Sequence, residues 1–185
     1  EFFIWEDILS VIASGRGEFL RGSLSENAFL PAAGSIVRPL DWLSFKGNVA
    51  RTFRAPDFDE LYLDIETVRG NPDLQSERAW AWDAGTILGN DTWNAELVYF
   101  GSMTENAIAF VPVSSYVIEA TNLKDVQVHG LESVARFRPG RPWLLTCGYT
   151  FTRARRAESP SVQTPHQPEH QGFARAQLEL GPNVP

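Results

Sequence analysis

Apolar and polar residues alternate along most of the chain with a period of two, which is the pattern of a β-strand with one apolar face. The alternation is cleanest near residue 147. There, one face carries Trp143, Leu145, Cys147, Tyr149 and Phe151, and the other carries Thr146, Gly148, Thr150 and Thr152. The same period predicts about nine strands: Glu1–Trp5, Ile8–Leu20, Phe29–Arg38, Trp42–Thr52, Arg78–Leu88, Trp93–Met103, Lys124–Phe137, Trp143–Thr152 and His170–Leu180.

The connections between these strands alternate in length. Short turns are expected at Pro39–Asp41, Gly89–Asp91 and Pro139–Pro142, whereas the regions near Arg21, Arg54, Thr104 and Arg153 are long or irregular, with a hairpin tip at Val111–Ser115. Up-and-down outer-membrane barrels have tight turns on one side and long loops on the other. Soluble β-sandwiches also combine alternating strands with tight turns. Periodicity alone therefore leaves barrel and sandwich open.

A tryptophan follows each of the three short turns, at Trp42, Trp93 and Trp143. Amphipathic aromatic side chains gather at membrane interfaces, so a belt at one edge of a barrel would give this pattern. Trp42 fits less well, because its position in the alternation matches the polar face of its own strand.

The longest connection follows Thr52 and ends near Arg78. Pro56 disfavours the helical region for Ala55, and Asn71-Pro72-Asp73 is a turn sequence, with Gly70 free to take a positive φ just before it. A connection this long is usually functional or disordered. Its apolar residues favour an ordered segment.

The same connection carries several short motifs in a fixed order. They are Phe53-Arg54-Ala55-Pro56, Glu60-Leu61-Tyr62, Gly70-Asn71-Pro72-Asp73-Leu74 and Glu77-Arg78. In this order and spacing they resemble the barrel signature of TonB-dependent outer-membrane receptors. Ser76 stands where that family commonly has proline. Asn122, with Gly130-Leu131-Glu132 further on, adds a second similarity.

The resemblance implies an all-β fold, an antiparallel up-and-down meander that forms part of a transmembrane β-barrel. It also implies a place in the outer membrane of a Gram-negative bacterium, where such receptors import a scarce ligand such as an iron–siderophore, cobalamin or a glycan. The expected partners are the TonB complex of the inner membrane, outer-membrane lipid and a small ligand such as a metal chelate. We expect residues 1–185 to be a fragment of a single barrel domain, with the plug domain and the closing C-terminal strands absent. A soluble β-sandwich that binds a ligand or carbohydrate, and a passive porin, are the alternatives.

The composition of the chain argues against several classes of partner and structure. The 185-residue chain has a formal charge of −7, which argues against a nucleic-acid partner bound through a basic face. Cys147 is the only cysteine, so no internal disulfide is expected. No window approaches the length of an apolar transmembrane helix.

The candidate ligand-binding residues lie in the longest connection, on what the resemblance makes the external side. They are Arg54, Asp57, Asp59, Glu60, Tyr62 and Asn71. Aromatic area with fixed polar groups suits a selective binding surface. The alternative for the acidic residues is solvation or pairing with Arg54 and Arg69, and Phe53, Phe58 and Leu61 are expected to pack the loop.

We expect no catalytic site, no cofactor and no metal site. The acidic cluster lacks the spacing of a calcium-binding EF-hand loop, because Tyr62 stands where the turn glycine belongs. His166 and His170 are separated by Pro168, which prevents a helix from bringing both onto one metal.

The polar faces of the strands carry charged and amide side chains that would line a wet barrel interior and pair with one another. They are Arg16, Glu18, Lys46, Asn48, Asp83, Asn94, Glu96, Glu132, Arg136 and Arg175. The opposite faces, with Leu145, Tyr149 and Phe151, are expected to face lipid.

Overall fold

The computed structural model describes residues 2–5, 8–21, 25–156 and 168–178. One sheet contains nine strands in sequence order: β1 (Phe2–Trp5), β2 (Leu9–Phe19), β3 (Asn27–Leu40), β4 (Leu43–Arg54), β7 (Glu77–Gly89), β8 (Trp93–Glu105), β11 (Val126–Gly140), β12 (Trp143–Arg156) and β13 (His170–Leu178). Glu1 and the residues after Leu178, at the ends of the first and last predicted strands, lie outside the described residues, as does His166.

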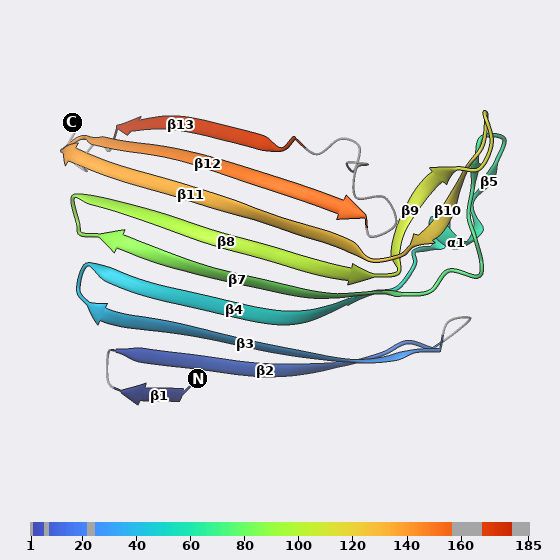
Figure 1. Ribbon diagram of the computed structural model, residues 1–185, viewed down its shortest axis with the longest axis horizontal. Helices are drawn as coiled ribbons and strands as arrows, with labels where there is room; N and C mark the ends of the chain where they lie inside the picture. The colour runs from blue at the N-terminus through green and yellow to red at the C-terminus, as the bar shows by residue number, and fades with distance from the viewer. Residues whose placement is uncertain (1, 6–7, 22–24, 157–167, 179–185) are drawn as a thin grey trace, which may run out of the picture.

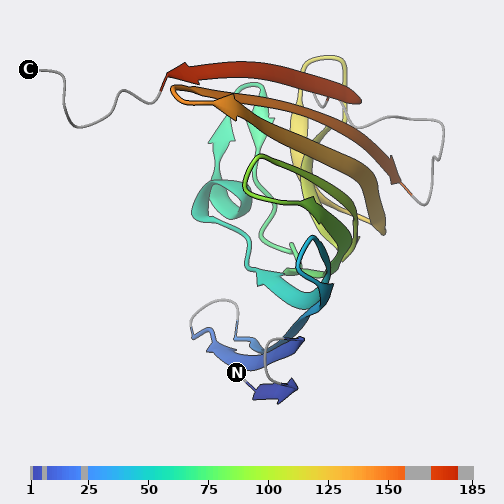
Figure 2. The ribbon, with the colours of Figure 1, turned by 90° about the vertical axis from the view of Figure 1, so that its left-hand side faces the viewer.

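Every strand of this sheet pairs antiparallel with its neighbours in the order given, which confirms the predicted meander. The turns after β3, β7 and β11 meet at one end of the sheet, and the longer connections meet at the other (Figure 1). The sheet curves without closing in the described residues, and β1 and β13 are its two edges (Figure 2). The all-β meander and the separation of short and long connections were therefore predicted correctly.

The polar faces of the strands form one continuous surface. An open hollow of about 520 Å³ is lined by Lys46, Asn48, Asp83, Glu96, Glu132 and Arg136, among others. Lys46 Nζ donates a hydrogen bond to Glu96, and Asn48 Nδ2 donates one to Asp83 Oδ1 over 2.9 Å. Arg136 donates to Asn94 Oδ1 over 3.3 Å. The expected pairing among the polar side chains is thus present.

The opposite face is apolar and exposed. Leu145 and Tyr149 lie on it, across from Thr146 and Thr150, as the alternation predicts. Trp93 and Trp143 stand on the same face at the short-turn end, and both are exposed. Trp42 lies in the turn before β4 rather than within the strand, which explains why its place in the alternation was misleading.

The longest connection is not a plain loop. It contains a five-residue helix, α1 (Phe58–Tyr62), and two short strands, β5 (Asp64–Ile65) and β6 (Val68–Arg69). None of these three elements was predicted from the sequence. Within the described residues no helix is long and apolar enough to span a bilayer.

The connection between β8 and β11 forms a hairpin of β9 (Ala107–Pro112) and β10 (Ile118–Leu123), with its tip where expected. β10 also pairs parallel with β6, giving a second sheet in the order β5-β6-β10-β9. The prediction that each strand pairs with its sequence neighbour is therefore wrong in this small sheet. We call residues 57–76 together with residues 106–123 the loop module.

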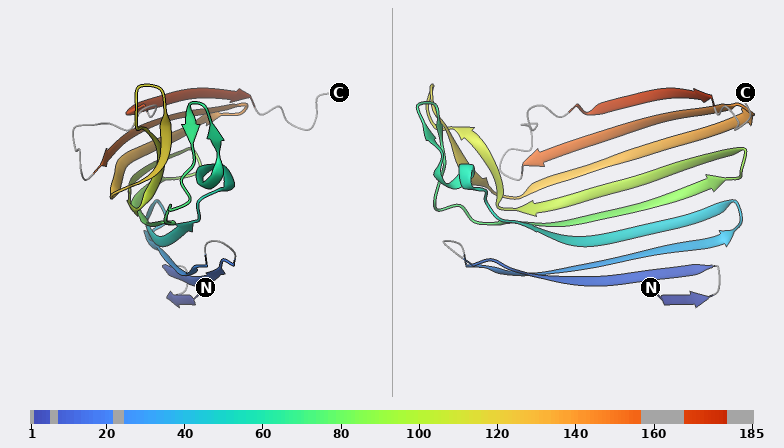
Figure 3. Two further views of the ribbon diagram at one scale, coloured as in Figure 1. Left: turned by 90° about the vertical axis from the view of Figure 1, so that its right-hand side faces the viewer. Right: turned by 180° about the vertical axis from the view of Figure 1, so that it is seen from behind.

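The loop module has its own small core. Leu61, Leu74 and Ala120 are buried, and Ile108 packs against them. Leu61 comes from α1, Leu74 from the turn after β6, Ala120 from β10 and Ile108 from β9. The apolar residues of each connection are therefore buried by residues of the other. The module stands at the long-connection end of the sheet, and α1 lies on the concave side (Figure 3).

Candidate functional site

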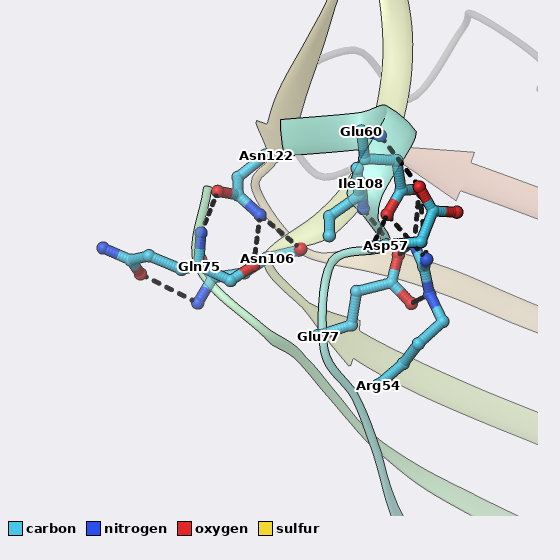
Figure 4. A network of polar contacts seen from close by, with 8 residues as sticks. All are labelled: Arg54, Asp57, Glu60, Gln75, Glu77, Asn106, Ile108 and Asn122. Carbon is cyan, nitrogen blue, oxygen red and sulfur yellow. Dashed lines mark hydrogen bonds and ion pairs between the residues drawn. The ribbon is translucent and has the colours of Figure 1, made fainter. Parts of the chain in front are cut away.

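Arg54, the last residue of β4, anchors the base of the loop module. Its guanidinium donates to both carboxylate oxygens of Glu77 over 2.8 Å, and to both oxygens of Glu60 over 2.9–3.1 Å (Figure 4). Arg54 keeps the inward position of Lys46 and Asn48 in the alternation, and the helix it reaches lies on the concave side. The concave face is therefore the polar face of the sheet.

Glu77 connects this cluster to the second connection. Its Oε1 also accepts a hydrogen bond from the backbone N–H of Ile108 over 2.6 Å. Arg54 is the last residue of β4 and Glu77 is the first residue of β7. Both therefore lie closer than Trp80 to the long-connection end of the sheet. The hydrogen bonds from Arg54 and then from Ile108 lower the pKa of Glu77, while partial burial opposes the shift. The same carboxylates raise the pKa of Arg54, so both groups are charged at neutral pH.

The helix α1 begins with a capping box. Asp57 Oδ1 accepts from the backbone N–H of Glu60 over 2.8 Å, and Glu60 Oε2 accepts from the backbone N–H of Asp57 over 2.9 Å. This reciprocal pair satisfies two amides that the start of a helix leaves without partners. A five-residue helix is too short to be stable alone, so the cap and the bond from Glu60 to Arg54 hold it in place.

The turn after β6 brings its backbone against α1. Asn71 Oδ1 accepts from the backbone N–H of Asp73 over 2.9 Å, and the Asn71 N–H donates to the carbonyl of Glu60. A Cβ on Gly70 would lie 2.7–2.8 Å from backbone atoms of residues 61–63. Gly70 is not among the residues with positive φ, so that expectation is wrong. Glycine is needed here for close approach rather than for an unusual backbone angle.

Asn122 on β10 ties the two connections together a second time. Its Nδ2 donates to the carbonyls of Gln75 and Asn106 over 2.9 and 2.8 Å, and its Oδ1 accepts from the N–H of Gln75 over 2.8 Å. Asn106 has a φ of 55°, which asparagine tolerates better than most residues. The candidate residues named from the sequence did not include Gln75, Glu77, Asn106 or Asn122. The resemblance, which includes Glu77 and Asn122, was the available signal for these two residues.

Two of the candidate residues, Tyr62 and Asp59, have exposed side chains that form no hydrogen bond among the described residues of the loop module. Tyr62 is exposed and packs its ring against Phe58 at a centroid distance of 5.1 Å. An open cleft of about 440 Å³ is lined by Tyr62, Asp64 and Arg69, among others. Asp59, in the first turn of α1, is also exposed. Arg54, Asp57, Glu60 and Asn71 hold the loop module together, whereas Tyr62 and Asp59 present side chains to the outside.

The comparison with protein families decides which class of protein this is. Residues 5–181 match the sequence model of the family described as "TonB dependent receptor-like, beta-barrel". The chain belongs to this TonB-dependent receptor family. Barrels of the family lie in the outer membrane of Gram-negative bacteria, and the family consists of transport receptors rather than enzymes.

One member of the family that matches this receptor chain is a distant relative. The hemoglobin-haptoglobin-binding protein A of Haemophilus influenzae is 27% identical over 116 residues, which cover 60% of this chain and 10% of that protein. The receptor chain thus spans about a tenth of the length of that relative.

Solved receptors share the fold of this TonB-dependent receptor barrel. The ferric enterobactin receptor of Pseudomonas aeruginosa, in complex with enterobactin, superposes with a TM-score of 0.76 at 16% identity, covering 95% of this chain and 29% of that one. The siderophore receptor PirA of the same organism gives 0.71 at 17% identity, covering 83% and 32%.

Proposed function

We propose that the full-length protein is an outer-membrane receptor that imports a scarce ligand with energy relayed through the TonB complex. Residues 1–185 would then be part of a single barrel domain, and a plug domain would fill its interior. Membership of the family supports this most directly. Iron-containing ligands are the best first candidates, because the similar proteins include a siderophore receptor and a hemoglobin-haptoglobin-binding protein.

We infer that the loop module contributes to the ligand-binding surface. Tyr62 is exposed at the edge of a cleft and Asp59 is exposed on the same helix, whereas Glu60 and Asp57 are fixed by several hydrogen bonds. A rigid support lowers the entropic cost of ordering a binding surface. Arg54, Asp57, Glu60 and Asn71 would act mainly by positioning Tyr62 and Asp59.

The import function is tested in cells that produce the full-length receptor. Iron-55 is supplied as ferric enterobactin and, separately, haem iron-55 is supplied as hemoglobin, in strains with and without TonB. Uptake that requires both the receptor and TonB supports the proposal. Equal uptake with and without TonB contradicts energy coupling, and no receptor-dependent uptake of either probe contradicts iron import.

The role of the module is tested by equilibrium binding of the transported probe to purified full-length receptor. Tyr62→Ala and Asp59→Ala are each expected to weaken binding by about fivefold or more. Leu145→Ala, on the outward face of β12, should leave affinity unchanged. Loop variants that bind as the wild type does would assign the binding residues to other parts of the receptor.

A further inference from the structure

The outward face of the sheet carries a basic patch near its long-connection end. Arg153 lies directly opposite His129 in the β11–β12 pair, and Arg155 lies opposite Gln127. Both arginines share the outward face of β12 with Tyr149, and both are exposed. We call His129, Arg153 and Arg155 the margin patch.

The arginines of the margin patch have no acidic partner among the described residues. Among the described residues, salt bridges involve Arg16, Lys46, Arg54 and Arg78, and none involves Arg153 or Arg155. The outward acid Glu105 lies on β8, two strands from β12 in the sheet, and stands opposite Arg78 on β7. The two guanidinium groups are therefore available to an anion.

The margin patch lies just beyond a row of aromatic side chains. Tyr149 shares a 2.7 Å hydrogen bond between its hydroxyl and His170 Nδ1, and the ring of His170 is 5.2 Å from that of Phe151. Rings with one apolar and one polar end occupy the level of lipid headgroups. Arg153 and Arg155 follow Phe151 by two and four residues, which is about 7 and 13 Å along a strand. They lie at the height of the headgroups or just beyond it.

An apolar groove begins below this aromatic row on the same strands. One hollow of about 590 Å³ is lined by Leu97, Ala135, Cys147 and Tyr149, among others, and spans strands β7 to β12. A second, of about 450 Å³, continues over Ala135 and Cys147 towards β13. Cys147 is six residues from Arg153, a separation of about 20 Å along the strand. The margin patch and the apolar groove therefore follow one another along the same strands, as the charged headgroup and the acyl chain of one lipid do.

We propose that this face binds a phosphate-bearing membrane lipid, with its phosphate between Arg153 and Arg155 and one acyl chain in the groove. Guanidinium groups bind phosphate oxygens through paired, charge-assisted hydrogen bonds. The aligned groove favours a lipid over free phosphate, because an inorganic anion would make no use of it. Such a lipid is bound on the outer wall of the barrel, separate from the transported ligand.

The proposal is tested with full-length receptor in neutral maltoside detergent. Phosphatidylglycerol is titrated into the micelles and bound lipid is counted by native mass spectrometry. Each of Arg153→Gln and Arg155→Gln is expected to weaken binding about fivefold, and the pair about 25-fold. Diacylglycerol with the same chains, which lacks the phosphate, should bind weakly to every variant. Ala135→Phe, which fills the groove, should weaken lipid binding while leaving both arginines in place.

Arg136→Gln is the matched control, because Arg136 borders the polar hollow on the concave face and lines neither of the two apolar hollows. It should leave phosphatidylglycerol binding unchanged, and the Arg153→Lys/Arg155→Lys pair should retain most of it if the glutamine pair fails to fold. Equal binding of diacylglycerol and phosphatidylglycerol would overturn the proposal. So would unchanged binding by the glutamine pair, equal loss in Arg136→Gln, or complete displacement by millimolar inorganic phosphate.

Discussion

At the scale of single residues, Glu77 receives hydrogen bonds from two separate parts of the chain, Arg54 and the amide of Ile108. Because these bonds lower its pKa, ionised Glu77 stabilises the loop module at every pH above the ordinary pKa of a glutamate. That stabilisation is lost as the pH falls through the lowered pKa of the folded state.

We therefore expect the Ile108 amide to lose hydrogen-exchange protection only below the ordinary glutamate pKa. Glu77→Gln cannot ionise, so this variant should show reduced protection at neutral pH and no further loss on acidification. Hydrogen exchange measured by mass spectrometry on peptides covering residues 106–112 gives the protection as a function of pH for the wild type and for Glu77→Gln. Coincident curves for the two proteins would show that Glu77 does not control the pH response.

Gly70 occupies a position where a side chain would collide with neighbouring backbone atoms. The atoms that a Cβ would meet are backbone atoms of residues 61–63, which cannot rotate away as a side chain could. Gly70→Ala should destabilise the module by about 1–3 kcal/mol. Limited proteolysis of the full-length receptor should then cut residues 57–76 at least about fivefold faster.

Gly172→Ala is the control for this measurement, because the nearest atom to its Cβ would be the carbonyl oxygen of Gly148 at an ordinary 3.5 Å. Its cleavage rate should match that of the wild type. Equal rates for Gly70→Ala and Gly172→Ala would mean that the turn moves aside without cost.

At the scale of elements, the strands of the main sheet were predictable and the loop module was not. Alternation over ten or more residues identified β12 and its neighbours, because a strand with one apolar face leaves a long periodic signal. α1 has five residues, too few for helical periodicity, although Asp57 and Glu60 have the spacing of a capping box. The β6–β10 pair joins two-residue segments from distant connections, and such a short parallel contact leaves no pattern in the sequence.

The arrangement of the candidate ligand-binding residues was also predictable only in part. Polar residue types and the resemblance placed all six candidates in the connection between β4 and β7 or at its base, and the structure gives Arg54, Asp57, Glu60 and Asn71 hydrogen bonds there. Sequence spacing could not separate these residues from exposed Tyr62 and Asp59, because that separation depends on how α1 packs. Ligand binding by any of the six stays a prediction.

Asn122 provides a test of whether the two connections act as one element. Asn122→Ala removes three hydrogen bonds and leaves the amide and carbonyl of Gln75 without this partner. We expect a loss of about 1–3 kcal/mol that exposes both connections together. Hydrogen exchange should rise in peptides covering residues 71–77 and 106–112 to the same extent.

Asn90→Ala is the matched control, since the Asn90 side chain accepts bonds only from the nearby Thr92 and Trp93 amides of a short turn. That variant should leave both connections protected. A rise confined to residues 106–112 in Asn122→Ala would instead mean that the connections open independently.

At the scale of the whole molecule, the two faces of the sheet predict how it sits in a bilayer. Trp93 and Trp143 lie at the short-turn edge of the apolar face, and Trp80 and Trp82 lie towards the other edge. We expect each to lie at an interface rather than at the bilayer centre. Full-length receptor variants that keep one of these tryptophans should be quenched more by lipids brominated near the headgroup than by lipids brominated near the chain end.

The control is Phe100→Trp in a variant that otherwise lacks tryptophan. Phe100 lies on the concave face, where it borders the polar hollow, so its replacement should resist quenching by brominated lipid. Strong quenching of that position, or equal quenching of all positions at every depth, would contradict the assignment of the two faces.

The shared core of the loop module also bears on how new ligand specificity can arise. Leu74 and Ala120 come from different connections and are buried against the same neighbours, so replacing one connection alone would uncover apolar surface on the other. Recombination between related receptors would therefore succeed only when residues 57–76 and 106–123 are inherited together. For an engineer who wishes to transplant specificity, these two segments are a single cassette, even though 29 residues of β7 and β8 and their connecting turns separate them in the sequence.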